Sequence, residues 1–364
     1  MSVVPSPDEG ARSAMSARLD TLTKPVGSLG ALETLSIWAA GVQRGFGVGT
    51  PFRDVRLIIV AGDHDVAREA RTSAYPAEVT AQMVANFMTG GAAANVLAND
   101  LNVSVRVVDA CVATDYDGLV GPPDWVTTRI KASNGAIDRA DALTPDELNQ
   151  STTIGERVAN DVIDAGADLL IVGDMGIGNT TAAAALIAKL TESDAATVCG
   201  RGTGIDDATW MRKVAAIRDA LWRCRDVSAT GNPMEVMRLI GGADLAVMAT
   251  IMRQASLRGV PVILDGVVVT AAALVAEADH PGVQLWWLAG HRSVEPGHTI
   301  ALEHLQLDPV LDLGMRLGEG SGALMALGVL QQSLSLATNM ATFAEAAVTE
   351  ITHTTEGTVE PGED

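Results

Sequence analysis

Short, unbroken apolar runs recur along the chain and alternate with longer segments of helical character. The clearest run is Leu169, Leu170, Ile171 and Val172, which is typical of a strand covered on both faces. The pattern predicts strands over residues 55–61, 103–109, 169–173, 196–200, 260–265 and 284–289. It predicts helices over residues 76–98, 151–165, 207–223, 243–257 and 270–278, and an alanine-rich helix after Thr181.

This alternation indicates an α/β fold with a largely parallel sheet and right-handed crossovers. Ligands of such sheets bind beyond the carboxyl ends of the strands. In this sequence those ends are rich in glycine and polar residues, and they read AGDHD, VDACVATD, GDMGIGN, CGRGTGID, LDGV and AGHRSVEPGH. We therefore expect a binding site at that edge of the sheet.

Three segments lie outside the alternation. Before the first strand, Leu29, Leu32, Leu35, Trp38 and Val42 recur at helical spacing, so their apolar face must pack outside a simple sheet. Residues 113–144 are the least regular stretch and predict an excursion over the surface. The acidic, polar residues from about 350 to 364 predict a disordered tail.

A glycine turn joins the strand at 169–173 to the alanine-rich helix. Gly176 and Gly178 allow backbone conformations that other residues resist, and Asn179 or Thr180 can cap the helix and leave its first N–H groups free. An anion placed there meets these donors and the positive end of the helix dipole. The turn fits neither a P-loop nor GxGxxG, and a glycine turn needed only for packing is an equal alternative.

Two later stretches resemble this corner. In CGRGTGIDD, glycines at 200, 202 and 204 lead into a helix from about Asp207. Lys213 lies about two turns into that helix and could reach back to a phosphate, although a solvated surface lysine is an equal alternative. In LDGVVVT, Gly266 follows a buried strand and precedes a helix expected to begin near Thr270. The sequence thus predicts three corners suited to an anion.

Glu319 is the most conspicuous acid of the chain. Gly318, Gly320 and Gly322 surround it and let the backbone approach a ligand closely, and the apolar run at 323–330 places the next helix in the core. A partly desolvated carboxylate there would have a raised pKa and accept a proton near neutral pH. An acid that only complements a helix dipole is the alternative, and the three glycines favour the functional interpretation.

The stretch GHRSVEPGH suggests a metal site made of His291, Glu295 and His298. We reject it, because Pro296 and Gly297 break the helix that would align the ligands and no third imidazole lies nearby. No metal and no cofactor are therefore expected.

The stretch GDHD contains two carboxylates and an imidazole at the end of the first strand. Asp63, His64 and Asp65 could form a hydrolase site. Carboxylates that cap neighbouring loops are an equally good interpretation. The sequence leaves both interpretations open.

Composition narrows the class of partner. The 25 Lys and Arg against 45 Asp and Glu give a net charge of −20, which repels polyanions and argues against nucleic-acid binding. A small anionic substrate remains compatible if local backbone donors hold it. The three cysteines, at 111, 199 and 224, lack CxxC spacing. No signal peptide or membrane span is evident, so we expect a cytoplasmic protein.

Eight motifs resemble, in order, those of the nicotinate-nucleotide–dimethylbenzimidazole phosphoribosyltransferase (CobT) family. They are KPVGSLGALE, AYPAEVTAQMVANF, GDMGIGNTTAAAAL, GTGIDD, GGADLAVMA, LDGVVVTAAALVA, GHRSVEPGH and LDLGMRLGEGSGALMAL. The resemblance extends from about residue 22 to residue 343 and implies a Rossmann-like sheet. It also implies a homodimer and a small helical domain built from both chain ends. The expected parts are residues 1–50 and 331–349 for the small domain, 51–330 for the large domain and 350–364 for the tail.

The resemblance also implies a reaction. It is the transfer of 5-phosphoribose from nicotinate mononucleotide to 5,6-dimethylbenzimidazole, which yields α-ribazole 5′-phosphate and nicotinate for the lower ligand of cobalamin. Another aromatic acceptor, such as adenine or a phenol, and a non-catalytic nucleotide sensor are the alternatives. The expected partners are thus small molecules, with neither nucleic acid nor membrane.

Carried over by motif, the resemblance implies three groups of site residues. Glu319 corresponds to the general base of the family. The aromatic base would be bordered by Ala74, Tyr75, Gln82 and Leu317. The nucleotide and its phosphoribose would be held by Asp174, Met175, Gly176, Ile177, Gly178, Asn179, Thr180, Gly202, Thr203, Gly204, Lys213, Asp265, Gly266 and Ser293.

Two departures from the family pattern stand out. The family commonly has a glutamate where this chain has Asp174, which is shorter by one methylene. The first strand end normally reads GDHGV, with a GVS turn leading into YP, whereas here Asp65 and AREARTSAYP take their place. The edge of the base pocket is therefore expected to differ.

Overall fold

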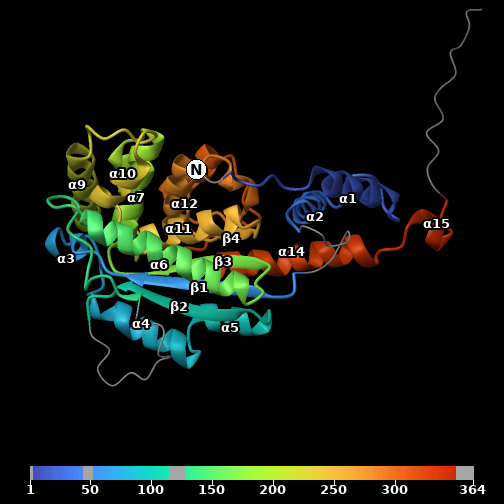
Figure 1. The fold of residues 1–364 in the computed structure, drawn as a ribbon, viewed down its shortest axis with the longest axis horizontal. Helices are drawn as coiled ribbons and strands as arrows, with labels where there is room; N and C mark the ends of the chain where they lie inside the picture. Colours follow the sequence, from blue (N-terminus) through green and yellow to red (C-terminus); the bar gives the residue numbers. More distant parts are fainter. Residues whose placement is uncertain (1–2, 44–51, 115–127, 350–364) are drawn as a thin grey trace, which may run out of the picture.

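A computed structural model describes residues 3–43, 52–114 and 128–349 (Figure 1). The predicted tail at 350–364 and the Gly121-Pro122-Pro123 part of the predicted excursion lie outside the described residues. None of the described helices is long and apolar enough to span a membrane.

The core of the large unit is one parallel sheet of five strands. The strands are β1 (Val55–Gly62), β2 (Ser104–Cys111), β3 (Leu169–Met175), β4 (Val262–Leu264) and β5 (Trp287–Ala289), in the order β2-β1-β3-β4-β5. The predicted α/β class with a parallel sheet is confirmed. In β3 the first six residues are buried, as expected for a strand covered on both faces.

Helices cover both faces of this sheet. Figure 1 shows α6 (Pro145–Asp164), α11 (Ala243–Leu257) and α12 (Val267–Asp279) on one side, and α4 (Glu78–Thr89) and α5 (Ala93–Asp100) on the other. The carboxyl ends of β1, β3, β4 and β5 lie at the same edge of the sheet, because all the strand pairings are parallel. The turns that follow the strands therefore meet there.

The predicted strand at 196–200 is wrong. Residues Ala195–Val198 form the short helix α8, which packs between α9 (Asp207–Arg223) and α13 (Pro296–Leu305). Short apolar runs do not distinguish a strand from a buried helical turn, and here tertiary packing decided.

The other corrections concern element boundaries. The helix predicted at 76–98 is two helices, because Gly90 ends α4 with a left-handed φ of 81°. The helix predicted at 151–165 begins earlier, at Pro145, where Thr144 and Glu147 form a capping box. The helix expected near Thr270 begins at Val267. The strand predicted at 284–289 begins as the 3₁₀ helix Val283–Trp286.

A second, smaller core lies away from the sheet, at the right of Figure 1. It joins α1 (Glu9–Thr21), α2 (Ala31–Val42) and the last turns of α14 (Ser321–Asn339). Its buried members are Met15, Leu19, Leu22, Ala40 and Ala337. The long helix α14 thus begins beside the sheet edge and ends in this helical cluster.

Candidate active site

A cavity of about 740 Å³ opens where the strand ends meet. Its walls come from the turns after β3, β4 and β5, from the 316–319 segment, from the 202–203 turn and from α4. It contains Glu319 and most of the other predicted site residues, namely Tyr75, Asp174, Met175, Gly176, Ile177, Asn179, Thr180, Gly202, Thr203, Gly266, Ser293 and Leu317. A small adjoining recess adds Gly178 and Lys213. Such a volume suits small-molecule substrates.

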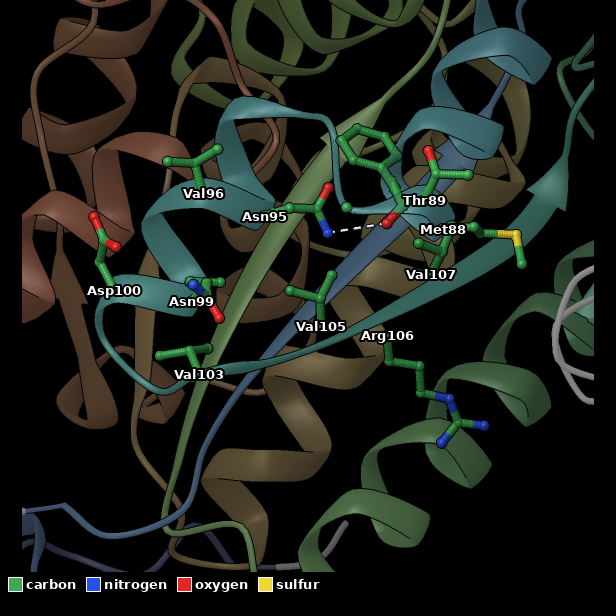
Figure 2. Close-up of a pocket in the computed structure, with 13 residues that line it drawn as sticks. Met88, Thr89, Asn95, Val96, Asn99, Asp100, Val103, Val105, Arg106 and Val107 are labelled. Atoms are coloured by element: carbon green, nitrogen blue, oxygen red, sulfur yellow. Dashed lines mark hydrogen bonds between the residues drawn. The ribbon is translucent and has the colours of Figure 1, made fainter.

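Another hollow of similar volume, about 760 Å³, lies at the β2 edge of the sheet. Figure 2 shows its residues from α4, α5 and β2, with the Asn95 side chain donating a hydrogen bond to the Phe87 carbonyl at 2.9 Å. It contains none of the predicted site residues. We therefore place the candidate active site in the cavity at the strand ends.

The first glycine corner has the geometry that its sequence predicts. Gly178 is the N-cap of α7 (Asn179–Thr191) and adopts a left-handed φ of 95°. The first N–H groups of a helix have no acceptor within it, and in α7 these belong to Asn179 and Thr180, which line the cavity. The positive end of the α7 dipole thus faces the cavity.

The corner after β4 presents a second helix terminus. Gly266 is the N-cap of α12, and the first helical residues, Val267 and Val268, line the cavity with it. Their apolar side chains leave the backbone N–H groups as the polar groups of this wall. Two of the three predicted corners therefore direct a helix N-terminus at the cavity.

The corner at 200–204 differs from the other two. The N–H of Gly202 donates to Glu295 Oε1 at 2.8 Å, so this N–H is not free to bind an anion. The N-terminus of α9 is capped by Asp206, whose Oδ1 accepts from the Thr209 N–H at 2.8 Å. Gly204 lies outside the cavity. The glycine pattern resembles that of the other corners, but the carboxylates of Glu295 and Asp206 already accept from backbone N–H groups here.

Lys213 is buried between two of the corners and is not a solvated surface lysine. Its side chain is 1% exposed, and Nζ donates to Thr180 Oγ1 at 2.9 Å and to the Gly200 carbonyl at 3.3 Å. Burial lowers the pKa of Lys213, and the negative charge of Glu295 opposes that shift. The cation is therefore held beside the first turn of α7.

Glu319 lies in the cavity with one carboxylate oxygen free. It is 4% exposed, its φ is 64°, and Oε2 has no hydrogen-bond partner among the described residues. Burial raises the pKa of Glu319, the charge of Asp265 adds to this, and a hydrogen bond from the Ala94 backbone opposes it. A buried acid with a free oxygen and a raised pKa is suited to accept a proton.

Asp265 fixes the turn that carries Glu319. Its carboxylate accepts from the N–H groups of Gly320, Gly322 and Ala323 at 3.1, 2.8 and 3.0 Å. These groups belong to the start of α14, so Asp265 is the acid that complements this helix end. It does not line the cavity and complements the start of α14, whereas Glu319 accepts from the backbone of Ala94 in the first turn of α5.

Asp174 lies at the end of β3 and lines the same cavity. Its Oδ2 accepts from Asn179 Nδ2 at 2.8 Å, and its carbonyl accepts from the Glu319 N–H at 3.2 Å. Burial raises the pKa of Asp174 to about 8, with smaller contributions from the charges of Asp265, Asp244 and Glu319. Burial therefore favours the protonated form of this carboxyl.

The histidines of GHRSVEPGH do not form a ligand set. His298 Nδ1 accepts from the Ser293 N–H at 3.0 Å, which leaves Nε2–H to donate to Thr270 Oγ1 at 3.0 Å. Burial lowers the pKa of His298 to about 3, so the ring is neutral. Within the described residues no cluster of His, Cys, Asp and Glu could hold a metal ion.

The GDHD stretch joins loops together. Asp63 accepts from the side chain of Thr80 and from the N–H groups of Ala113 and Ile177. His64 Nε2 lies 3.1 Å from Asp244 Oδ2. Neither Asp63 nor His64 lines the cavity, so the structure favours the loop-capping interpretation over a hydrolase site.

Two residues expected to border the aromatic base, Ala74 and Gln82, are exposed and are not among the residues that line the cavity, so their role stays a prediction. The residues of α4 that do line it, Val79 and Met83, are four apart and share one helix face. The other lining residues that the sequence did not assign to the site are Val267, Val268, His291, Glu295 and Arg316, whereas Gly318 lines it as expected. Several of them lie inside motifs that the sequence had already singled out.

Comparisons with known proteins agree with this site. A family model described as "Phosphoribosyltransferase" matches residues 4–348. The nicotinate-nucleotide–dimethylbenzimidazole phosphoribosyltransferase of Mycobacterium avium (strain 104) is 52% identical over 349 residues, which cover 95% of this chain and 97% of the relative. That of Mycobacterium tuberculosis (strain ATCC 25618 / H37Rv) is 52% identical over 348 residues, covering 95% and 93%. The crystal structure of CobT from Thermus thermophilus matches with a TM-score of 0.87 and 39% identity, over 93% of this chain and 99% of that chain.

Proposed function

The chain belongs to the nicotinate-nucleotide–dimethylbenzimidazole phosphoribosyltransferase family, and from this premise we propose how its cavity carries out the reaction. The enzyme transfers 5-phosphoribose from nicotinate mononucleotide to 5,6-dimethylbenzimidazole, and the products are α-ribazole 5′-phosphate and nicotinate. The observation that supports this most is the free Oε2 of Glu319, in a cavity with two helix N-termini in its walls.

The phosphoribose lies along the wall that carries the positive groups. The N–H groups at the start of α7 and the Lys213 ammonium, which is adjacent through Thr180, bind the phosphate. The start of α12 and Ser293 complete this wall. These local charges hold an anion although the protein carries a net charge of −20.

The acceptor base lies against the apolar side of the cavity. Val79 and Met83 of α4, Tyr75 before it and Leu317 provide this surface. Leu317 is two residues from Glu319, so a flat aromatic ring packed there presents its edge to the carboxylate. Aromatic and aliphatic contacts of this kind hold a ring with little charge selectivity.

The chemistry requires one proton acceptor. The carbon–nitrogen bond to nicotinate breaks, and its electron pair returns to the ring nitrogen, which was cationic and becomes neutral. One benzimidazole nitrogen attacks C1 of the ribose, and the N–H proton of the other nitrogen passes to Glu319. Departure of nicotinate needs no general acid, so positioning and one base are sufficient.

The remaining assignments concern the domains, the oligomeric state and the cellular location of the enzyme. The small unit made of residues 1–50 and 331–349 forms a domain around the second core, and residues 51–330 form the catalytic domain. The enzyme is a cytoplasmic homodimer.

Turnover with a panel of acceptors tests the proposal. The purified protein is incubated with nicotinate mononucleotide and with 5,6-dimethylbenzimidazole, adenine or a phenol, and nicotinate release and product mass are measured. We expect α-ribazole 5′-phosphate with the benzimidazole. Turnover only with adenine or a phenol would assign another acceptor, and binding of the mononucleotide without turnover of any acceptor would indicate a nucleotide sensor.

A further inference from the structure

His291 is a buried imidazole that lines the cavity and whose ring nitrogens have no partner. It follows β5 directly, after Gly290, and is 1% exposed. Among the described residues neither Nδ1 nor Nε2 makes a hydrogen bond. The nearest carboxylate oxygen, Asp265 Oδ1, lies 3.6 Å from Nε2, which is too far for a hydrogen bond.

The neighbouring His298 shows that an imidazole in this segment can be fully satisfied by the protein. Its two nitrogens are bonded to Ser293 and Thr270, and its ring lies 5.8 Å from that of His291. A buried polar group without a partner costs free energy. A bound ligand that supplies the partner would recover this cost, and the position of His291 in the cavity wall allows it.

The ring of His291 is held in place on two sides. A Cβ on Gly322, at the start of α14, would lie 2.0 Å from its Cδ2, and a Cβ on Gly266 would lie 3.7 Å from its Nε2. Asp265 Oδ1 already accepts from the Gly322 and Ala323 N–H groups. The ring therefore cannot move toward a protein partner without disturbing the helix start.

We propose that His291 binds a ribose hydroxyl of the phosphoribosyl donor through an imidazole nitrogen. This inference rests on the proposed function and adds a binding residue for the sugar. The phosphate donors lie at α7 and Lys213, whereas His291 lies against Gly322, Asp265 and Gly266, beside the turn that carries Glu319. The ribose carries the phosphate at C5 and is attacked at C1, near Glu319. Its hydroxyls are therefore the part of the donor that reaches His291.

Donor analogues that lack one hydroxyl test the contact directly. The affinities of nicotinate mononucleotide and of its 2′-deoxy and 3′-deoxy forms are measured by titration calorimetry, without acceptor, for wild type and for His291→Leu. In wild type, one deoxy form should bind about tenfold or more weakly than the parent, as expected when a buried group loses its partner. In His291→Leu the parent should weaken by a similar factor, and the difference between parent and deoxy form should disappear.

Controls separate this inference from the proposed function. His304→Leu changes an exposed histidine of α13 and should keep the wild-type affinities. His291→Asn keeps a polar group and is used if the melting curve shows that the Leu variant does not fold; it should reduce the deoxy difference. The same deoxy difference in wild type and variant would overturn the role of His291. A variant that instead stops distinguishing the mononucleotide from nicotinate riboside would place His291 at the phosphate and overturn it too.

Wild-type turnover decides the proposed function separately. If wild type binds the mononucleotide but transfers nothing, the proposed function fails, and the deoxy comparison still decides the role of His291. If wild type does not bind the mononucleotide, both fail.

Discussion

Two glutamates line the same cavity and are almost equally buried, yet their carboxylates are in opposite situations. Glu295 is 7% exposed, and its Oε1 accepts from the Gly202 N–H beside the buried cation of Lys213. Glu319 is 4% exposed, its Oε2 has no partner among the described residues, and its charged neighbour is Asp265. Burial alone therefore does not make a base. The partners of the carboxylate decide whether it supports a loop or accepts a proton.

The backbone explains how the two side chains reach these places. Glu295 occupies the N-cap position of α13, but its side chain makes no hydrogen bond to that helix. The side chain instead accepts from Gly202, which is distant in sequence. Glu319 adopts a left-handed φ between two glycines that do the same, and Asp265 holds the helix start behind it. A non-glycine residue in this region is strained, which is common at functional sites.

The largest expected effect is a fall in kcat that distinguishes Glu319 from Glu295. Glu319→Gln keeps the size and hydrogen-bonding reach of the side chain but removes its basicity. Because a general base commonly contributes about 10²–10⁴-fold, kcat should fall by that range with little change in either KM. Glu295→Gln, the matched control, should keep kcat within about tenfold, since its amide oxygen still accepts from Gly202. Equal losses of kcat in both variants would erase the distinction.

A smaller effect tests the cation beside Glu295. Lys213→Met keeps the length of the side chain and removes its charge, and a hydrogen bond to a charged group contributes about 1.5–3 kcal/mol. The KM for nicotinate mononucleotide should rise about tenfold to a hundredfold, while the KM for the acceptor stays the same. Lys189→Met, near the other end of α7, is the control and should behave as wild type. An unchanged KM in Lys213→Met would remove this lysine from the phosphate site.

The smallest effect concerns the support behind Glu319. Asp265→Asn replaces one acceptor oxygen by a donor, so at least one N–H of the α14 start loses its partner. We expect the free energy of unfolding to fall by about 1–3 kcal/mol, measured by thermal denaturation. Asp312→Asn, at an exposed position, should not change it. Unaltered stability of Asp265→Asn would show that the carboxylate does not fix this turn.

The central strands were predictable because they are buried on both faces. Such strands read as continuous apolar runs, and the runs at β1 and β3 predicted them within about two residues at either end. The edge strand β2, whose first four residues are not buried, was predicted within the same margin although it is not a continuous apolar run. The segment at 196–200 had the same local appearance but became α8, since the strand that pairs with β3 is β4. Local pattern predicts an element but not its place in a sheet.

The site was predictable where one motif provides both the backbone and the side chain. Gly318 beside Glu319 and Gly176 and Gly178 of the α7 turn are of this kind and line the cavity or its recess, whereas Gly320 and Gly322 do not. The hydrogen bond from Gly202 to Glu295 was not predictable, because 93 residues separate the two partners. The sequence indicated His291 only as a candidate metal ligand, and the lack of hydrogen-bond partners at its ring nitrogens becomes evident only from the burial of the ring.

The most direct test of Glu319 as the base is the pH dependence of kcat. A base works only when ionised, and burial raises the pKa of Glu319 above about 4.3, the value for glutamate in water. In wild type and in Glu295→Gln, kcat should fall on the acid side as Glu319 becomes protonated, and this dependence should be absent in Glu319→Gln. A dependence centred near pH 8 that persists in Glu319→Gln and disappears in Asp174→Asn would contradict this account and assign the proton to Asp174, whose pKa is about 8.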